Sequence, residues 1–245
     1  KNNKNFLITG ISDNGSGSSE QIISYYKLSE CKAYSDYKDL IFSKDNDIIC
    51  IVTPTHTHHK LIKLCVEAGK KIICEKPMGL SSFKKSYEND SFFFVNYHFR
   101  FNYLIMKIKS FLEKKKIGKI KTIKVQWFLK NPDMEKKHWK TNVKLGGSIK
   151  LEIFSHIVDY LTYILSKDVY DVQLKKNVKK PNNEIFKCKV LFSGIDACSI
   201  NIKRNSNFSG SHKILIIGSK SSILLFIGHP FDYKSKYLIY FKNRK

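Results

Sequence analysis

The sequence of 245 residues lacks any apolar run near the roughly 20 residues that a membrane-spanning helix needs. It also lacks an apolar leader behind a charged start, and none of its six cysteines forms a C-x-x-C pair. These absences argue against a membrane protein, a secreted protein stabilised by disulfides and a zinc site built on paired cysteines. We therefore expect a cytoplasmic globular protein whose thiols are reduced and buried.

Arginine is scarce for so basic a chain. Of the 44 basic residues only Arg100, Arg204 and Arg244 are arginine, while the formal net charge is +23. Base readout and bidentate phosphate binding both favour arginine over lysine. We therefore interpret the charge as a lysine-rich composition and expect no specific nucleic acid partner. A basic protein that binds acidic polymers remains a weaker alternative.

The first part of the chain has the pattern of strands alternating with helices. Apolar runs at 6–11 and 47–52 are typical of strands buried in a parallel sheet, and helical spacing covers 20–28 and 59–68. Another strand is predicted at 70–74. A strand, a helix and a strand with short connections form a βαβ unit, which requires a parallel sheet.

The later part has the pattern of a largely antiparallel sheet carrying helices. Apolar and polar residues alternate at 123–129, which predicts a half-buried strand, and amphipathic helices are predicted around 104–112 and over 147–165. Shorter strands are predicted at 185–192, 197–202, 214–217, 224–227 and 237–241. The expected fold class is α/β: a partial Rossmann domain over residues 1–96, followed by an α+β open-sheet domain over residues 97–245.

The start of the chain lacks a glycine-rich phosphate turn. Asp13 follows the first predicted strand, where a dinucleotide-binding fold places an acid that binds ribose hydroxyls and favours NAD over NADP. G-x-G-x-x-G should precede this acid by about 20 residues. Only twelve residues precede Asp13, and Gly15-Ser16-Gly17 follows it. We therefore expect the first βα unit to be missing, and note that Asp is also a common turn residue.

Two polar segments follow predicted strands, at the sheet edge where open α/β folds bind ligands. Residues 53–58 (TPTHTH) follow the strand at 47–52, although an exposed turn with surface histidines is an equal interpretation. Glu75-Lys76-Pro77 follows the strand at 70–74. A lysine there can serve as general acid or base if its surroundings bring its pKa towards about 7–8, but a lone lysine means little in this composition.

Three polar residues of the predicted helix at 147–165 share one face. Glu152, His156 and Asp159 are spaced by four and three residues. Such a stripe is usually only solvated. Lysine fills that role elsewhere in this sequence, however, and Gly146-Gly147 would let a ligand approach the backbone closely. The carboxylate one turn before His156 could orient its ring or bind a hydroxyl.

Taken in order, these segments resemble the Gfo/Idh/MocA oxidoreductases. The matching segments are the strand ending at Asp13, AYSDYKDLI (33–41), DIICIVTPTHTHHKLIKLCVEAGKKIICEKP (47–77), VNYHFRFN (95–102), KIGKIKTIKVQW (116–127) and GGSIKLEIFSHIVDYLTYIL (146–165). The similarity therefore runs from about residue 6 to at least residue 165.

The resemblance implies an NAD(P)-dependent enzyme of two domains, with a homo-oligomer formed through the second, open sheet. Members move a hydride between nicotinamide and a hydroxyl-bearing carbon of a sugar, nucleotide sugar or cyclitol. Lys76 and His156 match the acid–base pair, and Glu152, which the resemblance also places among the catalytic residues, matches an aspartate one turn before His156. The residues implied at the cofactor are Asp13, Thr53, Pro54, His58, Glu75 and Lys76. Arg100 and Asp159 would border the substrate, and no metal or membrane is expected.

Departures from the family pattern leave a second hypothesis open. Glu152 is one methylene longer than the usual aspartate, and the missing first βα unit would carry the pyrophosphate site. The chain also stops at Lys245, before a C-terminal helical segment that many members have. The alternative is a truncated or degenerate relative that does not catalyse. NAD is the expected cofactor, with NADP as the alternative.

Overall fold

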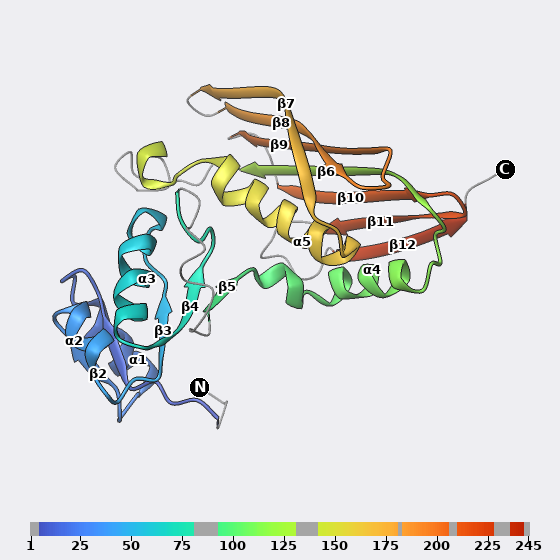
Figure 1. Cartoon of the computed structure of the whole chain (residues 1–245). Coiled ribbons are helices and arrows are strands. Elements are labelled where there is room, and N and C mark those ends of the chain that lie inside the picture. Colours follow the sequence, from blue (N-terminus) through green and yellow to red (C-terminus); the bar gives the residue numbers. More distant parts are fainter. Residues whose placement is uncertain are drawn as a thin grey trace. The chain divides into compact units, whose positions relative to one another are not determined.

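The chain divides into two compact units, Lys1–Asn96 and Tyr97–Lys245 (Figure 1). The computed structural model describes residues 5–80, 93–130, 142–180, 183–205, 210–227 and 236–242. Within these ranges no helix has the length and apolar character needed to cross a membrane.

The first unit consists of parallel strands joined by helices. Its elements are β1 (Gly10–Ser12), α1 (Ser18–Tyr26), β2 (Lys32–Tyr34), α2 (Tyr37–Phe42), β3 (Ile48–Ile51), the 3₁₀ turn η1 (Thr55–Thr57), α3 (His58–Glu67), β4 (Lys71–Glu75) and β5 (Phe93–Asn96). The pairs β1–β2, β3–β4 and β4–β5 are all parallel. The predicted Rossmann-like parallel sheet is therefore confirmed.

The core of the first unit lies where α2 and α3 cover β3 and β4. Its buried side chains are Ile41, Ile49, Ile51, Ile62, Cys65, Ile72 and Cys74. Gly69 follows α3 with φ +66°, a left-handed conformation that suits glycine and ends the helix before β4 begins. The short connection from α3 to β4 brings the polar ends of β3 and β4 to the same edge of the sheet.

The strands of the first unit form two separate sheets, β1–β2 and β3–β4–β5. The strand predicted at 6–11 is wrong over most of its length: Phe6, Leu7 and Ile8 precede β1 and are 67%, 62% and 51% exposed. Among the described residues β1 pairs only with β2, so Phe6–Ile8 have no second neighbour to pair with. These exposed apolar residues mark an edge at which a further strand could pair.

All six cysteines are free thiols. Burial raises the pKa of the Cys74, Cys188 and Cys198 thiols to about 12, so at neutral pH they stay protonated and unreactive. Cys65 is also buried, but Cys50 is exposed, which corrects the expectation of burial throughout. In β3 only Ile49 and Ile51 face the core, and Cys50 points to the opposite side of the strand.

The second unit is a seven-stranded sheet in the order β12-β11-β10-β6-β9-β8-β7. The strands are β6 (Ile120–Lys130), β7 (Val169–Lys180), β8 (Asn183–Phe192), β9 (Ala197–Asn205), β10 (Ser211–Gly218), β11 (Ser221–Ile227) and β12 (Lys236–Lys242). Neighbours are antiparallel except β6 and β9, which are parallel. The predicted largely antiparallel sheet is confirmed, and β7 is an additional edge strand.

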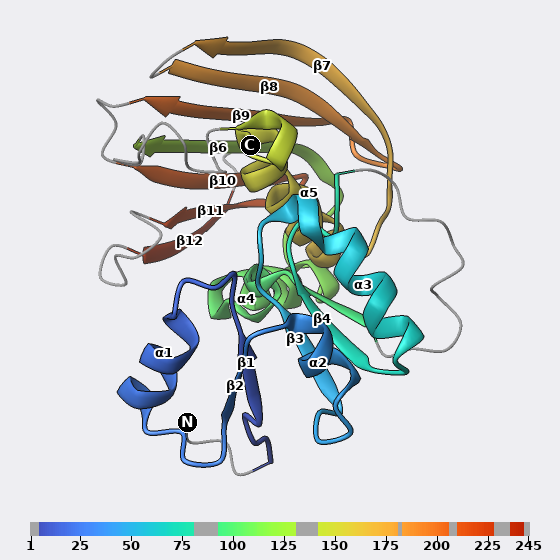
Figure 2. The ribbon, with the colours of Figure 1, turned by 90° about the vertical axis from the view of Figure 1, so that its left-hand side faces the viewer.

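Two helices cover one face of this sheet, α4 (Tyr103–Glu113) and α5 (Ser155–Leu165) (Figures 1 and 2). The 3₁₀ turn η3 (His98–Phe101) leads into α4, whose first N–H groups are capped by Asn102: its Oδ1 accepts from the backbone of Leu104 and Ile105. Buried Ile157, Tyr160 and Leu161 of α5 pack between α4 and the sheet. The apolar side of α5 is buried, as expected for an amphipathic helix, but His156 and Asp159 on its polar side are buried as well.

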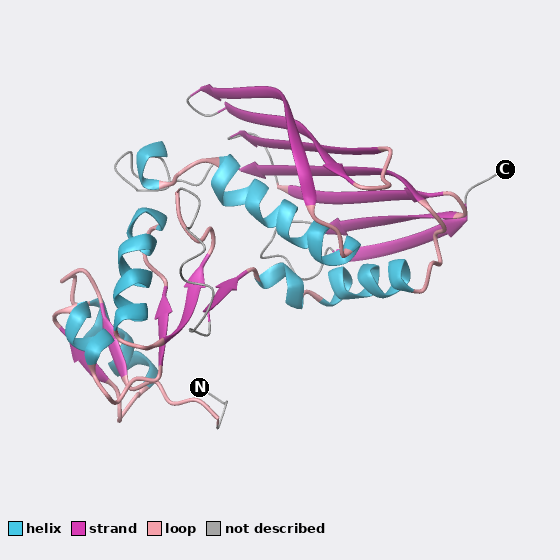
Figure 3. Ribbon diagram, viewed as in Figure 1, coloured by secondary structure: helices cyan, strands magenta, loops and turns pink. Residues whose placement is uncertain are grey.

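The helix predicted over 147–165 begins with a π-helical segment that runs directly into α5 (Figure 3). A 3₁₀ turn η5 (Val143–Leu145) and a π-helical segment η6 (Lys150–Phe154) precede α5. The π segment widens the helix locally, and Glu152 and His156, four residues apart, still lie about one turn apart along it. Such segments are rare and often occur at functional sites.

Candidate functional site

The loop after β3 contains one exposed and one buried histidine. His56 is exposed, whereas His58 is 1% exposed at the start of α3. The Nδ1 atom of His58 lies 2.9 Å from the Pro77 carbonyl oxygen, and its Nε2 atom lies 2.8 Å from the Thr53 carbonyl oxygen. His58 therefore contacts the protein's own backbone, and the interpretation as a surface histidine is wrong for this ring.

The loop after β4 holds Glu75 and Lys76. Asn96 Nδ2 donates to Glu75 Oε1 at 2.7 Å, and the Lys76 N–H donates to Glu75 Oε2 at 3.3 Å. Both carboxylate oxygens of Glu75 thus stabilise this corner of the sheet. Lys76 is half-buried and precedes a cis peptide bond to Pro77. The position at the carboxyl end of a parallel strand is where open α/β sheets place ligands.

The Asp13 carboxylate accepts hydrogen bonds from residues of its own turn. Its Oδ1 accepts from the N–H groups of Gly15 and Ser16, at 2.6 and 3.0 Å, and its Oδ2 accepts from the Ser19 N–H at 2.7 Å and the Ser19 hydroxyl at 3.1 Å. The Ser19 N–H is the largest influence that lowers the pKa of Asp13, against a smaller opposing effect of desolvation. The carboxylate therefore serves as a turn acceptor in the described chain.

In the second unit His156 lies among aromatic rings and is 4% exposed. Its ring centroid is 4.8 Å from that of His98, 5.2 Å from Phe99, 6.0 Å from Tyr97 and 6.5 Å from Trp127. Tyr97, His98 and Phe99 come from the segment that leads into α4, and Trp127 from the central strand β6. These rings fix the orientation of the imidazole.

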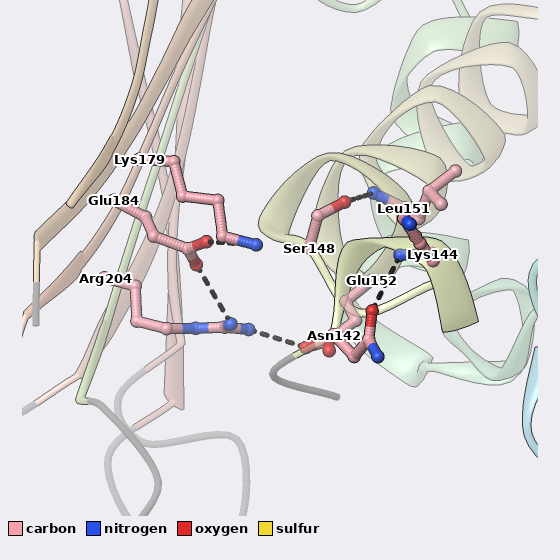
Figure 4. A network of polar contacts seen from close by, with 8 residues as sticks. All are labelled: Asn142, Lys144, Ser148, Leu151, Glu152, Lys179, Glu184 and Arg204. Atoms are coloured by element: carbon pink, nitrogen blue, oxygen red, sulfur yellow. Dashed lines mark hydrogen bonds and ion pairs between the residues drawn. The ribbon is translucent and has the colours of Figure 1, made fainter. Parts of the chain in front are cut away.

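Glu152 belongs to an ion-pair network on the sheet (Figure 4). Arg204 Nη2 of β9 lies 2.6 Å from Glu152 Oε2, Arg204 Nη1 lies 3.1 Å from Glu184 Oε2 of β8, and Lys179 Nζ of β7 lies 3.9 Å from Glu184 Oε1. Their side chains, apart from that of Lys179, are 11–14% exposed. The sequence analysis missed Arg204 and Glu184 as site residues. The one available signal in the sequence was Arg204 itself, a residue type that is rare in this chain, at an alternate position of β9 that faces the core.

Arg100 and Asp159, both named as substrate neighbours, are joined to each other. Arg100 Nε lies 3.0 Å from both Asp159 oxygens and its Nη2 also donates to Oδ1. The Asp159 side chain is 6% exposed and that of Arg100 43%. The hydrogen bond to Asp159 raises the pKa of Arg100. Asp159 therefore is not a solvated polar residue, and it holds the guanidinium in place.

An open pocket of about 430 Å³ lies on the second unit beside this ion pair. It is lined by Tyr97, Arg100, Lys150, Leu151, Phe154, Ser155, Val158, Asp159 and Thr162. Its wall is mostly one side of η6 and α5, with the guanidinium and Lys150 as its cationic groups. No three His, Cys, Asp or Glu side chains of the described ranges gather closely enough to hold a metal ion.

Comparison with known proteins gives the same two-part division of the chain. A family model described as "Oxidoreductase family, NAD-binding Rossmann fold" matches residues 1–88, and the "GFO/IDH/MocA C-terminal domain" model matches residues 105–224. Myo-inositol 2-dehydrogenase of Thermotoga maritima is 27% identical over 152 residues, 60% of this chain and 44% of that protein. The uncharacterized oxidoreductase YrbE of Bacillus subtilis is 30% identical over 147 residues, 58% of this chain and 42% of that protein.

A solved structure extends the likeness of the fold to nearly the whole chain. Levoglucosan dehydrogenase in complex with NADH and levoglucosan superposes with a TM-score of 0.78 at 16% identity, covering 97% of this chain and 71% of that one. The chain matches less than half the length of the two curated relatives. The two domain models match successive parts of the chain in the order expected for one protein family. The protein therefore belongs to the GFO/IDH/MocA oxidoreductase family.

Proposed function

We propose that the protein is an NAD-dependent oxidoreductase that acts on a hydroxyl-bearing carbon of a sugar-like or cyclitol substrate. The observation that carries this proposal is Lys76 in Glu75-Lys76-Pro77, half-buried at the carboxyl end of β4 in a domain that matches the NAD-binding model. Relatives named for myo-inositol and levoglucosan support a cyclic polyol as substrate class. NADP is the alternative cofactor.

The residues at the ends of β3 and β4 fit a nicotinamide cofactor in part. Thr53 and Lys76 offer a hydroxyl and an ammonium group at the ligand-binding edge of a parallel sheet, and Pro54 shapes the turn between β3 and α3. Asp13 fits less well, because its four acceptor positions are used within its turn. Bound NAD would supply the acceptor of the hydride. The chain's own groups supply the proton transfer and the positioning.

Lys76 and His156 are proposed as the acid–base pair. Lys76 Nζ would accept the proton of the substrate hydroxyl during oxidation and return it during reduction. His156, held by its aromatic neighbours, would exchange that proton with Lys76. Lys76 belongs to the first unit and His156 to the second.

Glu152 and Asp159 are proposed as positioning residues. The Glu152 carboxylate accepts a hydrogen bond from Arg204, and this contact anchors the π-helical segment before α5 to the sheet. Asp159 holds Arg100 beside the pocket, where the exposed part of the guanidinium can meet substrate oxygens. We therefore assign proton transfer to His156 and not to the carboxylate one turn earlier.

The test is turnover of NAD with a panel of inositols, anhydrosugars and free sugars, using full-length protein. We expect one of these to be oxidised, and Lys76→Ala to lower kcat by about 10²–10⁴. Lys71→Ala is the matched control, because Lys71 is exposed at the other end of β4. Full activity in Lys76→Ala, measured on folded protein, would contradict the mechanism.

The second candidate function is a relative that no longer catalyses. The saturated carboxylate of Asp13 and the separation of the first unit into two sheets favour it. Binding of NADH without turnover of any substrate in the panel would support this candidate over the first.

A further inference from the structure

Two consecutive histidines of α3 hold the loop that carries Lys76. His58 places its two ring nitrogens against carbonyl oxygens of two different loops, Thr53 after β3 and Pro77 after β4. The ring is 1% exposed, so water does not compete for these contacts. One side chain therefore joins the two loops at the ligand-binding edge of the sheet.

The chemistry of these contacts explains how the ring holds both loops. A carbonyl oxygen only accepts hydrogen bonds, so His58 holds the loops through its ring N–H. Each of its two ring nitrogens lies within 3 Å of one of the two carbonyl oxygens.

His59 provides a second, steric contact with the same loop. A Cβ added at Gly79 would collide with Nε2 and Cδ2 of the His59 ring, so Gly79 lies directly against this side chain. The loop after β4 is thus held at Pro77 by hydrogen bonding and at Gly79 by close packing. His56, two residues before His58, is exposed and does not share this environment.

We propose that His58, whose buried ring lies between the carbonyls of Thr53 and Pro77, is a positioning residue that fixes the backbone from which Lys76 projects. The Pro77 carbonyl is one residue beyond Lys76, so holding it at a set distance from Thr53 fixes the direction of the lysine side chain relative to the neighbouring loop. The effect on catalysis rests on the proposed function, in which Lys76 transfers the proton. The link between the two loops does not depend on it.

The link is tested without any activity. In full-length protein labelled with ¹⁵N on histidine, we expect the ring N–H of His58 to exchange slowly, because the ring is buried and lies against two carbonyl oxygens. Its signals are assigned by their loss in His58→Gln. In His58→Phe, hydrogen–deuterium exchange should rise in peptides that cover 53–57 and 76–80, with little change in β9 and β10. Fast exchange of the ring N–H, or unchanged exchange in these peptides, would overturn the proposal.

The positioning role is tested by kinetics on the same variants. His58→Phe should lower kcat by about 10²-fold while the KM for NAD changes less, because displacement of a catalytic group by about 1 Å has that effect. His58→Gln, which keeps a donor, should recover part of the loss, and His56→Phe should match the wild type. A purely structural role would reduce the folded fraction and leave kcat per folded molecule unchanged, which would overturn the positioning role. If the wild type shows no turnover, the proposed function fails, and the exchange and ¹⁵N data still decide the link.

Discussion

Replacing Arg204 by methionine would leave two carboxylates, Glu152 and Glu184, without the guanidinium that lies between them. Both side chains are largely buried, at 14% and 13% exposed. Removing one partner of a buried ion pair costs about 3–5 kcal/mol, because the remaining charge stays desolvated. Here the two carboxylates are partly exposed, and Lys179 lies 3.9 Å from Glu184, so part of that cost is relieved. We therefore expect Arg204→Met to lower the free energy of unfolding by about 2–4 kcal/mol.

The assay is urea unfolding followed by tryptophan fluorescence, with melting temperature as a second readout. For a unit of this size each kcal/mol lowers Tm by about 2–4 °C, so a fall of roughly 5–15 °C is expected. Lys179→Met is the matched control within the network. Lys179 is 46% exposed and only 3.9 Å from its partner, so its loss should cost about 0–1 kcal/mol. Replacing Glu152, Glu184 and Arg204 together by leucine, leucine and methionine should recover most of the stability. A loss below about 0.5 kcal/mol in Arg204→Met, with an unchanged denaturant slope, would refute the reasoning.

Three further perturbations test other parts of the structure. Burial lowers the pKa of His212 from 6.5 to about 3, so the folded state resists protonation of this ring. The contribution of neutral His212 to stability is present above about pH 6.5 and is lost as the pH falls towards 3. His212→Phe should flatten this acid dependence of the urea midpoint, and an unchanged dependence on pH would contradict the burial. Asn102→Ala removes the cap of α4 and should cost about 1 kcal/mol, measured by urea unfolding, whereas no loss would show that the cap is replaced by water. Gly79→Ala places a methyl group against His59 and should lower Tm and disturb the loop after β4 by exchange; a variant as stable as the wild type would show that the His59 ring moves away at little cost.

The sequence correctly predicted the elements whose own apolar pattern indicates which side chains are buried. The continuous apolar runs at 47–52 and 70–74 became β3 and β4, in which alternate residues are buried in the core of the first unit. β7 was missed because it is an edge strand with nearly all of its side chains exposed, so it has no alternating pattern. Phe6–Ile8 were predicted as strand from hydrophobicity alone, but pairing also needs a neighbouring strand.

The candidate site was predictable by residue type and only in part by geometry. Helical spacing predicted one shared face for Glu152, His156 and Asp159. In the structure, each has a different partner: Arg204, a cluster of aromatic rings and Arg100. The partners on β8, β9 and η3 are distant in sequence, so only tertiary packing brings them to the helix.

The measurement that tests the central claim most directly is a fluorescence titration of full-length protein with NADH at fixed ionic strength, with NADPH as comparison. Fixed salt matters because the net charge of +23 attracts any anion. The account predicts saturable NADH binding between about 1 μM and 1 mM that persists at about 0.2 M salt. Binding that is absent at millimolar NADH, or that disappears with salt equally for both nucleotides, would contradict a nicotinamide-dependent enzyme.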